Sequence, residues 1–368
     1  MALTKPSLID RDASAIVQEM IAFYEAATGK TLQPGQPERL LINAFAYREV
    51  LLRNAIQSAA EQNLVSFAVF PMLDKLGELL GVERLAASAA EVTVTFSLIA
   101  GHGALVLPQG TRVASTDGKV IFETKESFSI LISDSDVNVD CICQQSGVVG
   151  NGYIAGTITN ILDPQAYITG AANADTSGGG SDEETDDQLR ERIKLAPSAF
   201  SSAGSVGAYK YHAFSANPSI IDVAVVSNVP GTVQIYPLVE GGIVTPGPIL
   251  AAVLVACSAE KVRPLTDTVT SASPTAVNYA IEVELLLYTD AEEADILSAV
   301  GTALTDYVAN QGTKLGKDIV VNQIIGLCQV PGVYKVTVVQ PAVDVVINET
   351  SFGKNTGITV TPTGFTNG

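Results

Sequence analysis

The chain has 368 residues, of which 47% are hydrophobic and 16% are charged. This composition predicts a globular protein with more than one hydrophobic core and excludes a disordered chain. The formal net charge is −18, from 39 acidic and 21 basic residues, which disfavours both nucleic acid and an anionic membrane surface as partners.

Neither a leader nor a membrane segment is visible. The N-terminus, MALTKPSLIDRDAS, lacks the basic segment and apolar core of a secretory signal, and no run approaches the ~18 apolar residues of a membrane span. We therefore expect synthesis in a reducing cytosol. Cys141 and Cys143 form a C-x-C pair on one face of a predicted strand and are expected to be small core residues, because metal ligands are usually spaced C-x2-C.

Two long helices are predicted near the N-terminus. The first covers residues 12–28, with Asp12 as its N-cap and Gly29 as its stop. The second begins at Pro37 and meets no Gly or Pro until about Phe70, which corresponds to roughly 50 Å of helix. A third, shorter helix is expected around residues 73–80.

The second helix has two neighbouring apolar tracks. One contains Leu41, Phe45, Leu52, Ile56 and Ala59, and the other contains Leu40, Ala44, Leu51 and Ala55. The first helix is about half as long and cannot cover both tracks. Either later domains or helices of other chains must cover the remainder, and we favour other chains. The residues expected in such an interchain bundle are Ile16, Met20, Phe23, Leu41, Phe45, Leu52 and Ile56.

The apolar period changes to two after Ala90. Short strands are predicted in VTVTFSL, ALVLPQGTRVAS, VIFET, SFSILI and VNVDCICQ. This β-rich region ends near residue 170 and is followed by GAANADTSGGGS, which we interpret as a flexible linker of small residues.

Helices and strands alternate in the remainder of the chain. Helices are expected at about 182–195, 208–216, 248–262, 291–310 and 321–329, and strands at IIDVAVVS, GTVQIYPLV, VNYAIEVELLLYT, YKVTVVQP and VDVVINE. Residues 212–237 and 322–348 share the order helix, Pro, strand, strand, which predicts two related layers, each a small sheet backed by helices.

The predicted fold class is therefore multidomain α+β, with an N-terminal long-helix bundle, a β-rich domain and two α/β domains. The expected domains are residues 1–88, residues 89–175, residues 176–270 and residues 271–368.

The chain does not fit the common sequence motifs of catalytic and cofactor-binding sites. His102 and His212 lie far apart and near no cluster with ligand spacing, so both are expected to be structural. AGSVG at residues 203–207 departs from the G-x-S-x-G elbow at its first position, and no P-loop is present. GNGYIA at residues 150–155 leads into a predicted strand, so its glycines are expected in turns and not in a dinucleotide site. No enzyme, metal or cofactor is predicted.

The densest group of ionisable residues is GGGSDEETDDQLRERI at residues 178–193. A calcium loop starting at Asp182 would need Gly at its sixth position and Glu at its twelfth, where the chain has Asp187 and Ile193. The calcium interpretation therefore fails.

A helix start explains the same stretch better. Ser181 and Glu184 have the spacing of a capping box, and acids in the first turn oppose the helix dipole. Asp186 and Arg190 stand four apart as a helical ion pair, and Leu189 with Ile193 would form the buried stripe. A functional acidic surface is the alternative.

Taken in order and spacing, several segments resemble the baseplate J-like proteins of contractile-tailed bacteriophages, which also occur in tailocins. These segments are PSLIDRDASAIVQEMIAFYEAATGKTLQPGQPERLLINAFAYREVLL, LDKLGELLGVERL, LPQGTRVAS, FET, SGVVGNGYIAGTITNI, GGGSDEETDDQLRERI, SAGSVGAYKYHAFSANPSIIDVAVVS, PGTVQIY and AEKVRPLTDTV.

The resemblance implies a structural protein without catalytic residues. Two copies of such a protein and one smaller I-like partner form a wedge unit through a shared bundle of N-terminal helices, and the C-terminal domains contact neighbouring wedges. The wedges form a ring around the hub and spike, near sheath-proximal baseplate proteins, and couple host contact to sheath contraction. The expected location is the tail baseplate of a virion or related contractile injection system, assembled in the host bacterial cytoplasm.

Two other functions are weighed against this one. A receptor- or glycan-binding tail protein would use the β-rich region around residues 91–170, which has few aromatic side chains beyond Phe96, Phe122, Phe128 and Tyr153. A cell-wall hydrolase would use the acids of residues 182–187, but consecutive carboxylates at a helix start point in different directions, whereas a hydrolase needs a facing pair.

Overall fold

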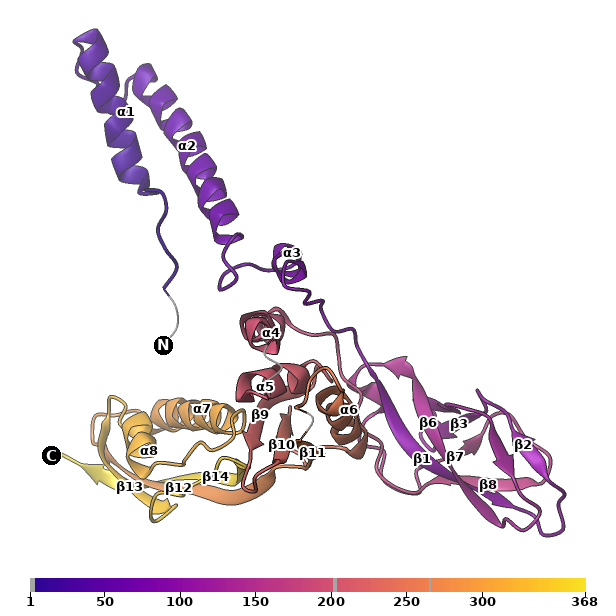
Figure 1. The fold of residues 1–368 in the computed structure, drawn as a ribbon. Coiled ribbons are helices and arrows are strands. Elements are labelled where there is room, and N and C mark those ends of the chain that lie inside the picture. Colours follow the sequence, from indigo (N-terminus) through magenta and orange to yellow (C-terminus); the bar gives the residue numbers. More distant parts are fainter. Residues whose placement is uncertain (1–3, 201–203, 265) are drawn as a thin grey trace. The chain divides into compact units, whose positions relative to one another are not determined.

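The computed structural model describes residues 4–200, 204–264 and 266–368 (Figure 1). The chain divides into two compact units, one formed by Met1–Glu83 with Leu189–Lys194 and the other by Arg84–Gln188 with Leu195–Gly368. Helices make up the first unit, whereas the second contains a curved β-sheet and two small sheets backed by helices. The predicted multidomain α+β class is confirmed.

The first unit contains a helical hairpin, with α1 (Ala13–Thr28) beside α2 (Pro37–Glu61), followed by the short α3 (Met72–Glu78). The predicted caps of α1 are both present: Asp12 accepts hydrogen bonds from the first-turn amides, and Gly29 is left-handed with φ 66°. Pro37 occupies the first turn of α2, as predicted. However, α2 ends at Glu61 and not near Phe70, so it is about 37 Å long.

The turn that follows α2 is held by a residue from far along the chain. The guanidinium of Arg190 donates from Nε to the carbonyl of Val65 at 2.9 Å and from Nη2 to that of Ala68 at 2.8 Å. Those carbonyls are thus held in a turn and do not continue the helical ladder. Arg190 belongs to α4 (Asp186–Ala199) and lies 125 residues from Val65, so no local pattern could disclose it.

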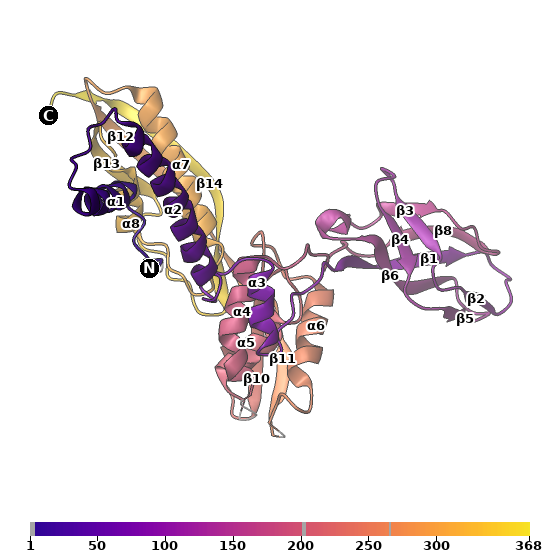
Figure 2. The same ribbon diagram turned by 90° about the horizontal axis from the view of Figure 1, so that it is seen from above.

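The β-rich region is a curved sheet with the strand order β7-β3-β4-β6-β1-β8, beside a separate β2–β5 pair (Figure 2). Its edge strands β7 and β8 contact each other, so the sheet closes into a barrel. Its elements are β1 (Ala89–Leu98), β2 (Leu105–Leu107), β3 (Arg112–Ser115), β4 (Ile121–Thr124), β5 (Phe128–Ile130), β6 (Asp136–Ser146), the 3-10 turn η1 (Val148–Gly150), β7 (Ile158–Ile161) and β8 (Ile168–Asn173).

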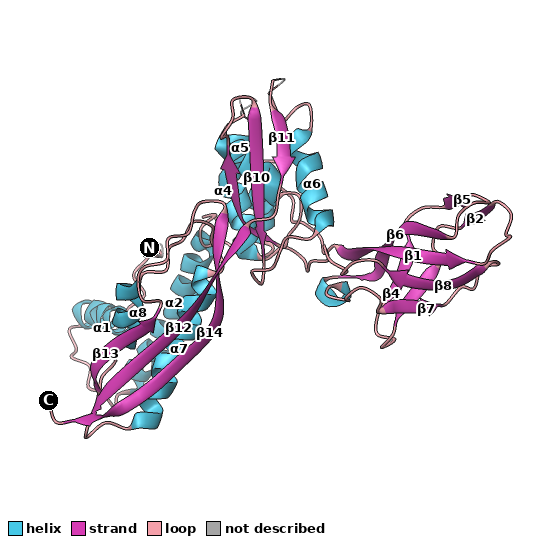
Figure 3. Ribbon diagram, turned by 90° about the horizontal axis from the view of Figure 1, so that it is seen from below, coloured by secondary structure: helices cyan, strands magenta, loops and turns pink. Residues whose placement is uncertain are grey.

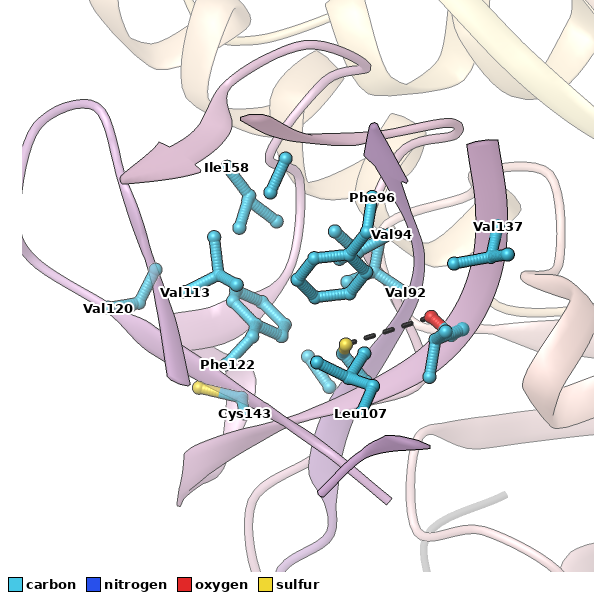
Figure 4. Packing of buried hydrophobic residues seen from close by; sticks show 14 of the residues in the cluster. Val92, Val94, Phe96, Leu107, Val113, Val120, Phe122, Val137, Cys143 and Ile158 are labelled. Atoms are coloured by element: carbon cyan, nitrogen blue, oxygen red, sulfur yellow. Dashed lines mark hydrogen bonds between the residues drawn. The ribbon is translucent and has the colours of Figure 1, made fainter. Parts of the chain in front are cut away.

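Alternate residues of these strands fill the barrel interior (Figure 4). Phe96 of β1 and Phe122 of β4 are fully buried there, together with Cys141 and Cys143 of β6, which confirms both cysteines as core residues. At the seam, the buried Asn173 of β8 accepts hydrogen bonds through Oδ1 from the N–H groups of Thr157 (2.9 Å) and Ile158 (2.8 Å).

The segment after β8 is not a flexible linker, contrary to our expectation. Residues 177–181 are buried, and backbone bonds join Gly178 to Glu91 and Ser181 to Ser88 in both directions. The glycines serve close packing: a Cβ on Gly180 would lie 2.4 Å from the carbonyl oxygen of Gly147. Small residues fit here because the backbones nearly touch.

The predicted start of α4 is displaced by about four residues. Its N-cap is Thr185, whose side chain forms a capping box with Gln188, so the box predicted at Ser181 and Glu184 is wrong. Ser181 lies in the bridge to Ser88, and the carboxylate of Glu184 accepts the N–H of Leu85. The expected buried stripe is confirmed, with Leu189 and Ile193 at 0% and 2% exposure.

Two three-stranded sheets with helical backing complete the second unit (Figure 3). In each sheet the central strand, β10 or β12, has one antiparallel and one parallel neighbour. The middle sheet has the order β11-β10-β9 and the C-terminal sheet β13-β12-β14. The elements are α5 (Val206–Phe214), β9 (Ile220–Val226), β10 (Thr232–Val239), α6 (Gly247–Ser258), β11 (Thr268–Ser271), β12 (Thr275–Tyr288), α7 (Glu293–Gln311), α8 (Val321–Cys328), β13 (Val333–Gln340) and β14 (Ser351–Thr366).

Two sheets backed by helices were predicted and are present. However, the predicted order helix, Pro, strand, strand does not hold for residues 322–348. The segment VDVVINE is irregular apart from one bridge between Ile319 and Val345, and the strands β11 and β14 were missed. β14 contains Pro362 and several glycines, which obscure its alternation. As an edge strand paired with β12, it tolerates a proline that a central strand would not.

Candidate functional site

The helical hairpin is held together on its inner side. The buried amide of Gln57 in α2 accepts the N–H of Leu8 at 2.9 Å and donates to the carbonyl of Pro6 at 2.7 Å. Lys5 forms an ion pair with Glu61 at 2.8 Å, and this hydrogen bond is the main reason that the pKa of Glu61 is lowered. The segment before α1 is thereby fastened along α2.

The outer side of α2 is apolar and exposed. Only Ala46 and Gln57 of this helix are buried. At about 100° per residue, the exposed apolar residues cover roughly 160° of the helix surface, opposite those two. We call this set the outer face; its large members and their exposed fractions are Leu40 61%, Leu41 60%, Phe45 66%, Leu51 45%, Leu52 55% and Ile56 46%.

The expected bundle residues are thus placed in two environments. Leu41, Phe45, Leu52 and Ile56 lie on the outer face. On α1, Phe23 is 77% exposed, whereas Ile16 is only 1% exposed and Met20 is partly buried. Leu40 and Leu51, which sequence analysis placed on the second track but not among the candidates, share the outer face.

A second group of exposed apolar residues lies at one end of the barrel. Ile99 and Tyr167 are neighbours there, since the N–H of Ile99 donates to the carbonyl of Tyr167 at 2.9 Å. Their exposed fractions are 51% and 54%, and those of Leu131 and Ile132 in the turn before β6 are 62% and 72%. The sequence did not disclose this group, because Leu131 and Ile132 belong to the predicted strand SFSILI, whereas β5 ends at Ile130 and leaves both in a turn.

Two residues of the acidic stretch, Glu184 and Asp186, have structural roles, whereas Asp182, Glu183 and Asp187 are exposed. The side chain of Arg84 donates from Nη1 to the carbonyl of Glu184 and from Nη2 to the carboxylate of Asp186, both at 2.6 Å. Glu184 is 2% exposed and accepts the N–H of Leu85 at 2.9 Å. These bonds fasten the segment that enters β1 to the start of α4.

The other candidate groups also have structural partners. Burial raises the pKa of Cys141 to about 12, which keeps this thiol protonated and unreactive. In AGSVG, Ala203 lies outside the described residues, and Ser205 is the N-cap of α5. GNGYIA leads into β7, as predicted.

Neither a metal cluster nor a membrane helix is found in the described part of the chain. No group of three or more His, Cys, Asp or Glu there is arranged to hold a metal ion. No helix there is long and apolar enough to cross a membrane.

Comparison with known proteins adds a consistent assignment along the chain. Four domain models of one family match in order: the baseplate J-like N-terminal domain at residues 36–91, the barrel domain at residues 93–180, the central domain at residues 201–273 and the C-terminal domain at residues 279–361. The chain therefore belongs to the baseplate J-like protein family, as its sequence suggested.

Two individual proteins are similar to this chain to different extents. Baseplate protein J of Escherichia phage P2 is 39% identical over 168 residues, which is 45% of this chain and 55% of that protein, so the match spans about half of the relative. A cryo-EM structure of the anti-feeding prophage baseplate aligns with 93% of this chain and 89% of its own, at 13% identity and a TM-score of 0.41. A structural likeness at that level is too weak to assign a function to this chain.

Proposed function

We propose that this protein is a structural, non-enzymatic component of a contractile-tail baseplate. The observation that carries the proposal is the outer face of α2, where six large apolar side chains are 45–66% exposed. A globular chain seldom leaves six large apolar side chains exposed on one side of a helix, here beside the single cation Arg48, unless another molecule covers them. Membership in the baseplate J-like family indicates which kind of assembly supplies that molecule.

The proposed partners are a second copy of this chain and a smaller I-like baseplate protein, which together form a wedge. The bundle residues of the proposal are Ile16, Met20, Phe23, Leu41, Phe45, Leu52 and Ile56. Leu40 and Leu51 extend the same surface, and Ile16 contributes from inside the hairpin.

The remaining parts of the chain have proposed roles in the ring. We assign residues 1–88 to the bundle, residues 89–175 to the barrel and residues 176–270 to the middle domain, and residues 271–368 would contact neighbouring wedges. The edge strands β13 and β14 support the last role, because unpaired strand edges can join sheets of adjacent subunits. The ring would surround the hub and spike in the virion tail, after assembly in the host cytoplasm, and couple host contact to sheath contraction.

The test is the double variant Leu52→Asp with Ile56→Asp, co-expressed with the I-like partner. Each buried Leu or Ile contributes about 1.5–3 kcal/mol, so losing two should weaken the complex by at least about 100-fold in a pull-down. The barrel and the two small sheets should remain folded, as judged by circular dichroism and thermal unfolding.

Asn43→Asp with Asn54→Asp is the matched control. It adds the same two carboxylates to exposed polar positions of α2, outside the outer face, and should leave the complex intact. Equal recovery of the partner by the Leu52/Ile56 variant and by the wild type would refute the bundle; equal losses in both double variants would point to charge alone.

The two alternative functions are less well supported. Phe96 and Phe122 are fully buried in the barrel and cannot stack on a glycan, which weakens the receptor-binding proposal. Glu184 and Asp186 are engaged with Leu85 and Arg84, which weakens the hydrolase proposal.

A further inference from the structure

Several buried polar atoms of the C-terminal sheet and of helix α7 have no protein hydrogen-bond partner. Within the described residues, these are the hydroxyls of Tyr279 and Tyr307, Oε1 of Gln311 and Nδ2 of Asn355. Tyr279 and Gln311 are 5% and 1% exposed. An unsatisfied buried polar group costs about as much as a lost hydrogen bond, so four near one another require an explanation.

The fold places these four groups together. Tyr279 of β12 stands opposite Asn355 of β14 in the parallel register, and strand alternation puts both side chains on the helix-covered face. Tyr307 and Gln311 lie one turn apart on α7, which packs against β14. Tyr279 and Tyr307 belong to the same hydrophobic cluster. Burial, and next the nearby Tyr307, raise the pKa of Tyr279 to about 12.

The chemistry of the four groups defines what they can bind. Gln311 Oε1 only accepts a hydrogen bond, Asn355 Nδ2 only donates one, and the two hydroxyls can do either. One water molecule has two donor and two acceptor positions, which matches this set. A cation would be repelled by the positively polarised amide N–H of Asn355, and an anion would be repelled by the carbonyl oxygen of Gln311. We propose that the four groups form a buried hydration site, in which an ordered water links α7 to β12 and β14.

The sign of a stability change tests this proposal in the full chain. If a water is bound, Tyr307→Phe removes one of its bonds and leaves the other groups poorly satisfied, so Tm should fall by about 2–4 °C. If the hydroxyl is instead unpaired, Phe removes a desolvated polar atom, and Tm should stay constant or rise. Tyr279→Phe should behave in the same way, and the double variant should lose less than the sum.

Tyr288→Phe is the matched control, because it removes a hydroxyl from an exposed tyrosine of the same strand and should leave Tm unchanged. A high-resolution crystal structure of the wild-type chain provides the direct measurement. We expect one solvent peak within hydrogen-bond distance of at least three of the four groups. A dry site, direct bonds among the four side chains, or a Tm that stays constant or rises in both Phe variants would overturn the proposal.

Discussion

His102 occupies an unusual position for an imidazole, between two backbone carbonyl oxygens. Its Nδ1 lies 2.8 Å from the carbonyl of Gly103 and its Nε2 lies 2.7 Å from that of Asp134, while the residue is only 2% exposed. Carbonyl oxygens only accept, so both bonds can form only when both ring nitrogens carry protons. The pKa of His102 is accordingly raised, first by the bond to the Asp134 carbonyl and then by that to Gly103.

The pKa of the other histidine is shifted in the opposite direction. His212 is partly buried in α5, and burial lowers its pKa. Because the chain has two histidines, their imidazole NMR signals should titrate separately, His102 above about 6.5 and His212 below it. His102→Gln should remove the higher titration, and a His102 signal that titrates below 6.5 would contradict the two-donor arrangement.

The same shifts predict opposite effects of pH on stability. The stabilising contribution of His102 to the free energy of unfolding is complete below about pH 6.5. It is lost as the pH rises through the raised pKa of His102. The contribution of His212 is present above about pH 6.5 and is lost as the pH falls through its lowered pKa. Structurally, protonated His102 ties the turn after β1 to the turn before β6, beside the exposed Ile99 and Leu131.

The glycine segment before α4 shows that a segment with the composition of a loop can be closely packed. Gly180→Ala should destabilise the protein by about 1–3 kcal/mol, because the new Cβ would meet the Gly147 carbonyl at 2.4 Å and the Ala90 nitrogen at 3.0 Å. The measurement is thermal unfolding combined with hydrogen exchange of the Glu91 amide, which bonds to Gly178.

Gly170→Ala provides the comparison for that substitution. Gly170 lies in β8 with an ordinary backbone conformation and open space around the position of a Cβ, so alanine there should be neutral or slightly stabilising. Equal tolerance of both substitutions would show that residues 178–180 are as free as a linker after all.

For the whole molecule, the outer face of α2 predicts behaviour in solution. Without its partner the purified chain should self-associate as its concentration rises, because apolar area is removed from water on contact. Size-exclusion chromatography with light scattering should detect this, and Leu52→Asp with Ile56→Asp should reduce it. The Asn43/Asn54 control should associate like the wild type. A wild-type chain that stays monomeric at high concentration would contradict this expectation.

The sequence alone determined the features that rest on local chemistry. The caps at Asp12 and Gly29, the start of α2 at Pro37, the core positions of Cys141 and Cys143, and the buried stripe of α4 all follow from side-chain period and backbone preference. The order of short motifs likewise pointed to the baseplate J-like family, because the family signal is spread along the chain.

Features that depend on distant partners became visible only in the folded chain. Arg190 holds the turn that follows α2, Glu184 and Ser181 bond to the segment before β1 and so displace the start of α4, and β12 supplies the neighbour that lets β14 form. The polar groups around Tyr279 come from two strands and a helix and have no common sequence signal. Hydrogen bonds between residues far apart in sequence override local preference, because an unpaired buried polar group costs more than a displaced helix end.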